Sequence, residues 1–186
     1  MRIISGKYKG RNLNFVSSKI TRPLKDSVRE NIFNILEHSN KIDSKIINSE
    51  ILDLYSGTGS FGIECISRGA KKVTFVEKDE NAISILKKNL DKLSINKKAL
   101  VVENEIEGFL RKKIRNKFDI FFFDPPFNDK SFLENLKVIK SFKNYQSKHI
   151  LIIHREKTSA ENFDNLLKIH LKKEYGRSMI LFASFI

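Results

Sequence analysis

The sequence contains one cysteine, Cys65, among its 186 residues. A lone cysteine excludes an internal disulfide and supplies no metal cluster, so we expect a reducing compartment such as the cytoplasm. The simplest interpretation of Cys65 is a small apolar residue inside a helix. No apolar run approaches the length of a membrane span, and the opening residues MRIISGKYKG contain no signal-peptide core. We therefore expect a cytoplasmic protein with no membrane partner.

Proline and glycine are also scarce, at three and eight residues, and they gather into no linker. Internal repeats and low-complexity blocks are missing as well. The chain is 40% hydrophobic and 31% charged, and its length is sufficient to bury one substantial core. We predict a single, monomeric domain over residues 1–186, with an N-terminal extension over 1–40 and the main fold over 50–186.

Acidic residues are absent from the first 25 residues, which carry seven basic ones. The whole chain has a formal net charge of +13, which favours a polyanionic partner, and nucleic acid ahead of a membrane surface. Aromatic Tyr8 and Phe15 lie among the basic residues, as on surfaces that contact phosphates and stack on bases. A solvated basic arm explains the charge equally well. The predicted contacts to nucleic acid are Arg2, Lys7, Tyr8, Lys9, Arg11, Lys19, Arg22 and Lys25.

The pattern of the N-terminal part predicts a hairpin and a helix. Residues 2–6 and 11–16 flank a turn rich in glycine and lysine and predict a short β-hairpin. Residues 27–38 place Val28, Ile32, Ile35 and Leu36 on one helical face. Ser27 and Glu30 have the spacing of a capping box at the start of that helix.

From residue 50 onward, apolar strands alternate with helices. Strands are predicted at 50–55, 72–77, 99–104, 118–124, 149–154, 166–176 and 177–186, and helices at 60–69, 79–93, 106–113 and 130–140. Continuous apolar strands separated by helices indicate an α/β fold with a mostly parallel, seven-stranded sheet and helices on both faces. Ligands of such sheets bind beyond the carboxyl ends of the strands.

Polar groups or glycines follow four successive predicted strands. Gly57 and Gly59 follow the first and allow a tight turn with close approach to a ligand. Glu77 ends the second, where a carboxylate can accept hydrogen bonds from both hydroxyls of a ribose. Glu105 follows the third, and Asp124 ends the fourth. Each alone has an ordinary explanation as a turn, a helix cap or a solvated strand end. Together, at one rim, they favour a functional site.

The glycines leave a competing interpretation open. Gly57, Gly59 and Gly62 match the G-x-G-x-x-G dinucleotide fingerprint, and Glu77 lies near the expected distance. A nicotinamide enzyme is therefore a competitor. Asp53, just before the glycines, argues against it, because a carboxylate there repels a pyrophosphate and suits a cationic amino group.

The stretch DIFFFDPPFND, residues 119–129, ends an apolar strand abruptly on an acid. Pro125 and Pro126 have fixed φ angles and donate no N–H, so carbonyl oxygens remain available as acceptors. Asp124 and the Pro125 carbonyl can accept both hydrogens of a planar exocyclic amine, and the carboxylate can take the proton as a methyl group arrives. Phe127 offers a flat surface to an unstacked base. A rigid turn is the ordinary explanation of these residues.

This constellation resembles the S-adenosylmethionine-dependent methyltransferases of the amino-group type, whose signature is [D/N]-P-P-[Y/F/W]. That signature covers adenine N6, cytosine N4 and guanine N2. The stretches RIISGKYKGR, TRPLKDSVRENIFNIL, LDLYSGTGSFG and YGRSMILFASF resemble the RsmD family, over nearly the whole chain. The resemblance implies a Rossmann-like class I methyltransferase fold that methylates guanine N2 of 16S ribosomal RNA in the small ribosomal subunit.

The same resemblance assigns roles to residues. Asp53 faces the methionine amino group, Glu77 holds the ribose hydroxyls, and Glu105 lies near the adenine. The implied cofactor contacts are Asp53, Tyr55, Ser56, Gly57, Thr58, Gly59, Glu77, Lys78, Glu105, Arg22 and Pro23, and the implied catalytic residues are Asp124, Pro125, Pro126 and Phe127. The chain departs from the family where Phe127 replaces the commoner tyrosine and Asn104-Glu105 replaces Gly-Asp.

Two further functions stay open: an adenine-N6 methyltransferase acting on DNA or RNA, and a catalytically weak RNA-binding factor of ribosome assembly. No metal is expected, because the four histidines show no ligand spacing. His38, His149, His154 and His170 are all predicted to be structural or surface residues, although His154 falls near the active rim.

Overall fold

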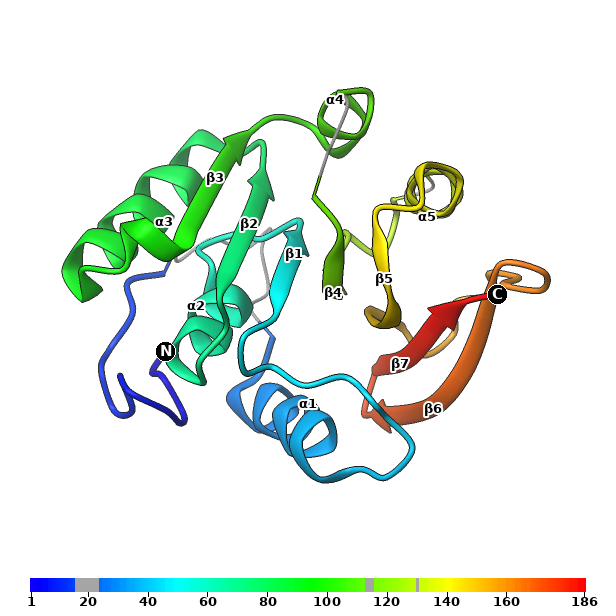
Figure 1. Cartoon of the computed structure of the whole chain (residues 1–186), viewed down its shortest axis with the longest axis horizontal. Coiled ribbons are helices and arrows are strands. Elements are labelled where there is room, and N and C mark those ends of the chain that lie inside the picture. The colour runs from blue at the N-terminus through cyan, green and yellow to red at the C-terminus, as the bar shows by residue number, and fades with distance from the viewer. Residues whose placement is uncertain (16–23, 113–115, 130) are drawn as a thin grey trace.

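The computed structural model describes residues 1–15, 24–112, 116–129 and 131–186. Seven strands form one sheet in the order β3-β2-β1-β4-β5-β7-β6 (Figure 1). They are β1 (Glu50–Leu54), β2 (Lys72–Glu77), β3 (Ala99–Glu103), β4 (Phe118–Phe123), β5 (Tyr145–Glu156), β6 (Leu167–Tyr175) and β7 (Ser178–Phe185). The first five run parallel, β7 is antiparallel to β5, and β6 is antiparallel to β7. The predicted seven-stranded, mostly parallel sheet is confirmed.

The helices cover both faces of this sheet, as predicted. They are α1 (Asp26–His38), α2 (Ser60–Ser67), α3 (Glu80–Leu93), α4 (Ile106–Leu110) and α5 (Phe132–Phe142), with a 3-10 turn, η1, at Asn96–Lys98. Strand β4 is continuously apolar because both of its faces are covered by helices. Ile120 and Phe122 pack with α1, α2 and α3, whereas Phe121 and Phe123 pack with α4 and α5. Figure 1 shows these two sets of helices on opposite faces of the sheet. Within the described ranges, no helix is long and apolar enough to cross a membrane.

The capping prediction for α1 was wrong. The helix begins at Asp26, one residue before Ser27, and its N-cap residue Lys25 makes no side-chain cap hydrogen bond. The predicted apolar face is present, with Val28, Ile32 and Leu36 buried. Helix α3 has a side-chain cap, because the Asp79 carboxylate accepts a hydrogen bond from the Ala82 N–H at 2.8 Å.

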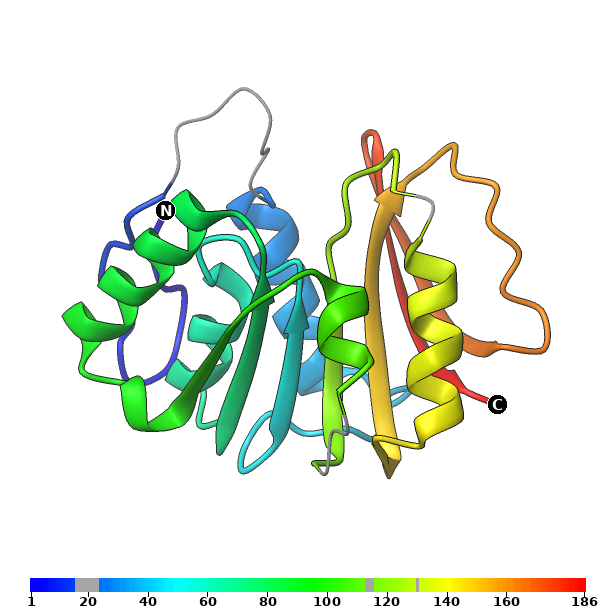
Figure 2. The ribbon, with the colours of Figure 1, turned by 90° about the horizontal axis from the view of Figure 1, so that it is seen from above.

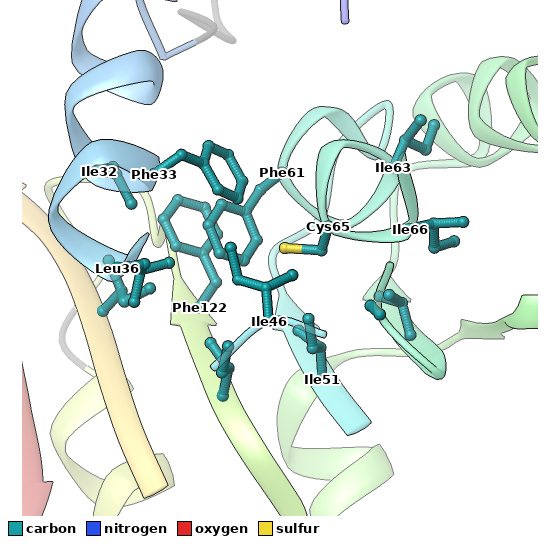
Figure 3. Packing of buried hydrophobic residues seen from close by; sticks show 14 of the residues in the cluster. Ile32, Phe33, Leu36, Ile46, Ile51, Phe61, Ile63, Cys65, Ile66 and Phe122 are labelled. Atoms are coloured by element: carbon teal, nitrogen blue, oxygen red, sulfur yellow. The ribbon is translucent and has the colours of Figure 1, made fainter. Parts of the chain in front are cut away.

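An aromatic stack joins two helices to the sheet (Figure 3). The ring of Phe61 in α2 lies between Phe33 of α1, at a centroid distance of 5.1 Å, and Phe122 of β4, at 4.0 Å. Cys65 is buried beside this stack, as predicted for a small apolar residue in a helix. Since stacked aromatic pairs add to the energy of burial, the stack holds α2 firmly where the helix begins, at the end of the glycine loop.

The N-terminal residues form the predicted short hairpin, which is attached to α2. An antiparallel bridge joins Arg2 and Asn12, and the Ile3 N–H donates to the Arg11 carbonyl at 3.0 Å. The buried Glu64 carboxylate accepts hydrogen bonds from the N–H groups of Ile4 and Ser5, at 2.7 and 2.9 Å. Next along the chain, Gly6 has φ +80, and an added Cβ would lie 2.0 Å from the Ser67 carbonyl oxygen. The close approach to the end of α2 therefore requires glycine at this position.

Candidate functional site

A cavity of about 620 Å³ opens at the carboxyl ends of the parallel strands. The strand arrowheads of β1 and β5 point to the same edge (Figure 2), and the volume is in the range of nucleotide and cofactor sites. The lining residues come from the ends of β1 to β5 and from the N-terminal part of the chain. They include Tyr55, Ser56, Gly57, Thr58, Glu77, Lys78, Asn104, Glu105, Glu107, Asp124, Pro125, Pro126, Phe127, Asn128, Asp129, Ser131 and His154, with Met1, Phe15 and Leu24.

Most of the predicted cofactor and catalytic residues therefore lie around one cavity. Two of them, Asp53 and Gly59, lie near it but are not part of its lining. Arg22 and Pro23, together with Lys19 of the predicted nucleic-acid contacts, fall outside the described residues.

The loop after β1 turns through left-handed backbone positions. Tyr55, Gly57 and Gly59 have φ angles of 59, 54 and 83. Gly59 is also the N-cap of α2, and a Cβ there would lie 2.3 Å from the Leu86 side chain. Gly57 has open space where its Cβ would be, so its backbone is accessible from the cavity.

Glu77 organises this loop. Its Oε2 accepts a hydrogen bond from the Gly57 N–H at 2.7 Å, and its Oε1 accepts from the N–H groups of Lys78 and Asp79 at 2.8 and 3.0 Å. The carboxylate thus links the end of β2 to the glycine loop. Both lone pairs of Oε1 are used, whereas Oε2 keeps one for a further donor.

Asp53 lies beneath the loop. Its side chain is buried, and its Oδ2 accepts a hydrogen bond from the Gly62 N–H in α2 at 3.0 Å. Oδ1 is buried with no hydrogen-bond partner among the described residues. Burial raises the pKa of this carboxyl well above its usual range, and the charges of Asp124 and Glu77 add to the effect. The observed role is to anchor α2; contact with a ligand amino group stays a prediction.

Residues from α4 and α5 form a polar wall that the sequence did not predict. The Asn135 side-chain amide donates to the Tyr55 hydroxyl at 3.2 Å and to Glu107 at 3.3 Å. Ser131 donates to Asp129 through both its N–H and its hydroxyl at 2.7 Å. Burial and the adjacent Asp129 raise the pKa of Tyr55, so the phenol keeps its proton. Glu105 precedes α4 but makes no side-chain cap hydrogen bond.

The residues of the D-P-P-F loop line the cavity, and two of their acceptor groups have no hydrogen-bond partner among the described residues. The Asp124 side chain is 28% exposed, and its Oδ1 is 2.7 Å from Nδ1 of His154. Its Oδ2 has no partner among the residues that the structure describes. Arg155 donates to the carbonyl oxygens of Pro126 and Phe127, both at 3.2 Å. The Pro125 carbonyl receives no hydrogen bond in the described chain, so the open acceptor is the one next to Asp124.

Arg155 is a structural support of this loop. It is buried, it pairs with Glu161 and its guanidinium lies 4.6 Å from the centre of the Phe132 ring. In place of water, the guanidinium therefore contacts a carboxylate, a ring face and two loop carbonyls. Neither Arg155 nor His154 was assigned a role from the sequence. The available signal was that β5 also ends at the rim.

Two exposed aromatic rings line the cavity. Phe127 is 41% exposed and meets the edge of the His154 ring at 5.5 Å, with an interplanar angle of 76°. Phe15, from the N-terminal segment, is 51% exposed. Large apolar rings left in solvent at a cavity mouth are available to contact a ligand.

A buried asparagine connects the N-terminal segment to the glycine loop. The Asn89 side chain in α3 accepts from the Asn14 N–H at 2.8 Å and donates to the Asn14 carbonyl at 3.0 Å. It also donates to the Thr58 carbonyl at 3.2 Å. Since Asn14 precedes Phe15, one amide holds the N-terminal segment beside the glycine loop at the cavity.

The basic turn of the N-terminal segment lies away from the cavity. The Lys7 N–H donates to the Ser67 carbonyl at the C-terminal end of α2, whereas the cavity is at the other end of that helix. Eight helical residues span about 12 Å. Tyr8 is half-buried, with Lys7 and Arg11 over its ring at 5.6 and 5.8 Å. The other predicted contacts, Arg2, Lys9 and Lys25, are exposed.

The described residues contain no group of three metal-binding side chains. A sheet in this strand order, with a glycine loop after β1, an acid ending β2 and a D-P-P-F loop after β4, defines a Rossmann-like class I methyltransferase. The solved structure of the Escherichia coli protein yhhF supports this class. It matches 100% of this chain and 97% of its own chain, with a TM-score of 0.86 and 27% sequence identity.

The family follows from sequence comparison. The family model described as "Conserved hypothetical protein 95" matches residues 1–184, and the chain belongs to that family, the RsmD family. Ribosomal RNA small subunit methyltransferase D of Buchnera aphidicola (subspecies Baizongia pistaciae) is 35% identical over 87% of this chain and 78% of the relative. The protein of the same name from Haemophilus influenzae is 41% identical over 69% of this chain and 64% of the relative.

Proposed function

We propose that this protein transfers a methyl group from S-adenosylmethionine to the exocyclic N2 amino group of a guanine in 16S ribosomal RNA. The observation that carries the proposal is the pair of open acceptors at the cavity, Asp124 Oδ2 and the Pro125 carbonyl. A planar amine has two hydrogens to donate, and these two acceptors are adjacent in the chain. The neighbouring carbonyls of Pro126 and Phe127 are already occupied by Arg155.

The residues around the cavity fit the cofactor. Glu77 presents a fixed carboxylate to the ribose, with Oε2 open to a hydroxyl, and Gly57 leaves its backbone open for close approach. The buried, unpartnered Asp53 Oδ1 supplies an acceptor for a cationic amino group. S-adenosylmethionine, when bound, supplies an electrophilic methyl group on a sulfonium.

The protein's contribution to the chemistry is positioning and proton acceptance. A base-ring amine is a poor nucleophile because its lone pair is delocalised into the ring. Two acceptors on its hydrogens favour a pyramidal nitrogen and direct the lone pair, and the Asp124 carboxylate then takes the proton that the nitrogen loses. Phe127 offers an exposed ring on which an unstacked base can lie.

The substrate class is supported by the relatives and by charge. The relatives are named for methylation of the small-subunit ribosomal RNA. The N-terminal segment, whose ends Met1 and Phe15 line the cavity, carries exposed cations at Arg2, Lys7, Lys9 and Arg11. We assign Lys7, Lys9 and Arg11 to backbone phosphates about one helix length from the target base, and Arg2 to a phosphate nearer to it.

The test is a methyl-transfer assay with S-adenosylmethionine labelled on its methyl group. Small ribosomal subunits from cells lacking this protein, naked 16S ribosomal RNA and duplex DNA are compared as acceptors, and the labelled nucleoside is identified after digestion. We expect N2-methylguanosine in ribosomal RNA. Labelled N6-methyladenosine would establish the adenine alternative. A protein that binds RNA but neither binds the cofactor nor transfers a methyl group would be an assembly factor.

RNA affinity is expected to fall steeply with salt, because binding releases counterions from the phosphates. Replacing Lys7, Lys9 and Arg11 by glutamine should reduce the slope of log K against log salt by about 2, at roughly 0.7 per lost contact. Fluorescence anisotropy with a labelled fragment of 16S RNA measures the slope. The matched control replaces three exposed lysines from the β5 to β6 half of the molecule, Lys143, Lys168 and Lys173. Equal slopes for the wild type and the N-terminal variant would exclude these phosphate contacts.

A further inference from the structure

The Asp124 carboxylate is held by a histidine of the neighbouring strand. Strands β4 and β5 are parallel with Phe123 opposite Ile153, so the next residues, Asp124 and His154, are adjacent at the rim. The His154 side chain is 8% exposed, and its Nδ1 lies 2.7 Å from Asp124 Oδ1. Its other ring nitrogen, Nε2, is buried and has no hydrogen-bond partner within the described ranges.

The surroundings of the two ring nitrogens decide where the proton of a neutral imidazole lies. A carboxylate oxygen accepts hydrogen bonds, so a proton on Nδ1 makes the observed contact favourable. A proton on Nε2 instead would bury an N–H without an acceptor and turn the Nδ1 lone pair towards a carboxylate. Buried N–H groups without partners are rarer than under-satisfied acceptors. The geometry therefore selects the Nδ1–H form.

We propose that His154 is a positioning residue for methyl transfer, which fixes Asp124 so that Oδ2 faces the target amine. The inference rests on the proposed function. It adds a residue that donates a hydrogen bond to the Asp124 carboxylate and does not itself touch the substrate. Without the Nδ1–H bond, the carboxylate is free to rotate about its Cβ–Cγ bond, and the two acceptors no longer point at one nitrogen. Small misplacements of this kind cost about 100-fold in rate.

Two substitutions separate the hydrogen bond from the packing of the ring. His154→Phe keeps an aromatic ring against Phe127 but removes the donor. His154→Asn removes the ring but can keep the donor, because asparagine Nδ2 and histidine Nδ1 are both bonded to Cγ. The ring contact and the hydrogen bond are thus each deleted once while the other is kept.

Loss of a hydrogen bond to a charged group predicts that His154→Phe lowers kcat by about 10- to 100-fold. KM and Kd for S-adenosylmethionine should stay within about threefold of wild type, because Glu77, Asp53 and the glycine loop are unchanged. His154→Asn should recover most of the lost kcat. The proposal is overturned if the phenylalanine variant keeps wild-type kcat, or if the asparagine variant is as slow as the phenylalanine variant while both stay folded.

A measurement on the unsubstituted protein covers the case in which a variant fails to fold. Two-bond ¹H–¹⁵N correlation spectra of the ¹⁵N-histidine-labelled protein distinguish the two neutral tautomers. We expect the proton on Nδ1 of His154 in the wild type and a change of that signal in Asp124→Ala. A proton on Nε2, or a signal unchanged by the Asp124 substitution, would refute the inference.

The two proposals fail in different ways. A wild-type protein that transfers no methyl group to ribosomal RNA would remove the proposed function, whatever the spectrum of His154 shows. An active wild type whose kcat is insensitive to His154→Phe would remove only the positioning role.

Discussion

Asp124→Ala is expected to lower the rate of methyl transfer by about 1,000-fold, within the 10²- to 10⁴-fold range of general-base contributions. Alanine removes one of the two open acceptors and the group that takes the proton from the amine. The affinity for S-adenosylmethionine should change by less than about threefold, because Glu77 and the glycine loop keep their mutual hydrogen bonds. Single-turnover methyl transfer and calorimetric titration measure the two quantities separately.

The matched control is Asn128→Ala, in the same loop. Asn128 also lines the cavity and is exposed, but it makes no hydrogen bond with another described residue. We expect transfer rates within about threefold of wild type for that variant. If Asp124→Ala kept more than a tenth of the wild-type rate, the carboxylate would not be the proton acceptor.

Asp124→Asn should be about as slow as Asp124→Ala. With His154 in its Nδ1–H form, the amide oxygen would bond to the ring and the amide NH2 would face the substrate amine, donor against donor. The amide can turn its oxygen to the substrate only if His154 moves its proton to Nε2, where no described partner is available. The signature of the amino-group methyltransferases allows asparagine at this position. In this chain, the loss of rate in Asp124→Asn therefore depends on the neighbouring His154.

The overall fold and the location of the site followed from local patterns. Apolar strands alternating with helices are enough to predict a parallel sheet, and a parallel sheet places its strand ends at one edge. Glu77, the glycine loop and Asp124 were identified because each is adjacent in sequence to a strand. That these residues would lie around one cavity could be predicted without knowledge of side-chain contacts.

Residues whose roles depend on distant partners were not found in this way. His154 was interpreted as a structural or surface residue, because its contact with Asp124 exists only once β5 lies beside β4. Asn89 sits inside a helix as a polar residue with no local partner, and its amide bonds to Asn14, 75 residues away. The capping box at Ser27 and Glu30 has the correct spacing, but the helix begins one residue earlier. A local motif predicts well only when its partners are also local.

Glu77→Ala is expected to raise the Kd for S-adenosylmethionine by about 100-fold, the upper range for one hydrogen bond to a charged group. The carboxylate is proposed to bind the ribose, and it also holds the N–H groups of Gly57, Lys78 and Asp79. Glu77→Gln should not rescue binding. Either orientation of the amide turns an NH2 group towards backbone N–H donors, at Gly57 or at Lys78 and Asp79.

The control for this variant is Glu103→Ala. Glu103 pairs with Glu77 in register on the adjacent strand, is exposed, and contacts Lys87 outside the cavity lining. Its removal also deletes one negative charge from the same edge of the sheet, so an unchanged Kd would show that a general charge effect is not the cause. Thermal unfolding without ligand checks that the glycine loop has not collapsed, and the added stabilisation by saturating cofactor reports the same affinity independently.

Together with Asp124→Ala, this variant assigns the two parts of the cavity to different steps. If Glu77 binds the nucleoside and Asp124 acts on the amine, Glu77→Ala loses cofactor affinity, and saturating cofactor restores much of its rate. Asp124→Ala keeps cofactor affinity, and no cofactor concentration restores its rate. A Glu77 variant with wild-type Kd would place the ribose elsewhere on the rim and leave Glu77 as a support of the glycine loop.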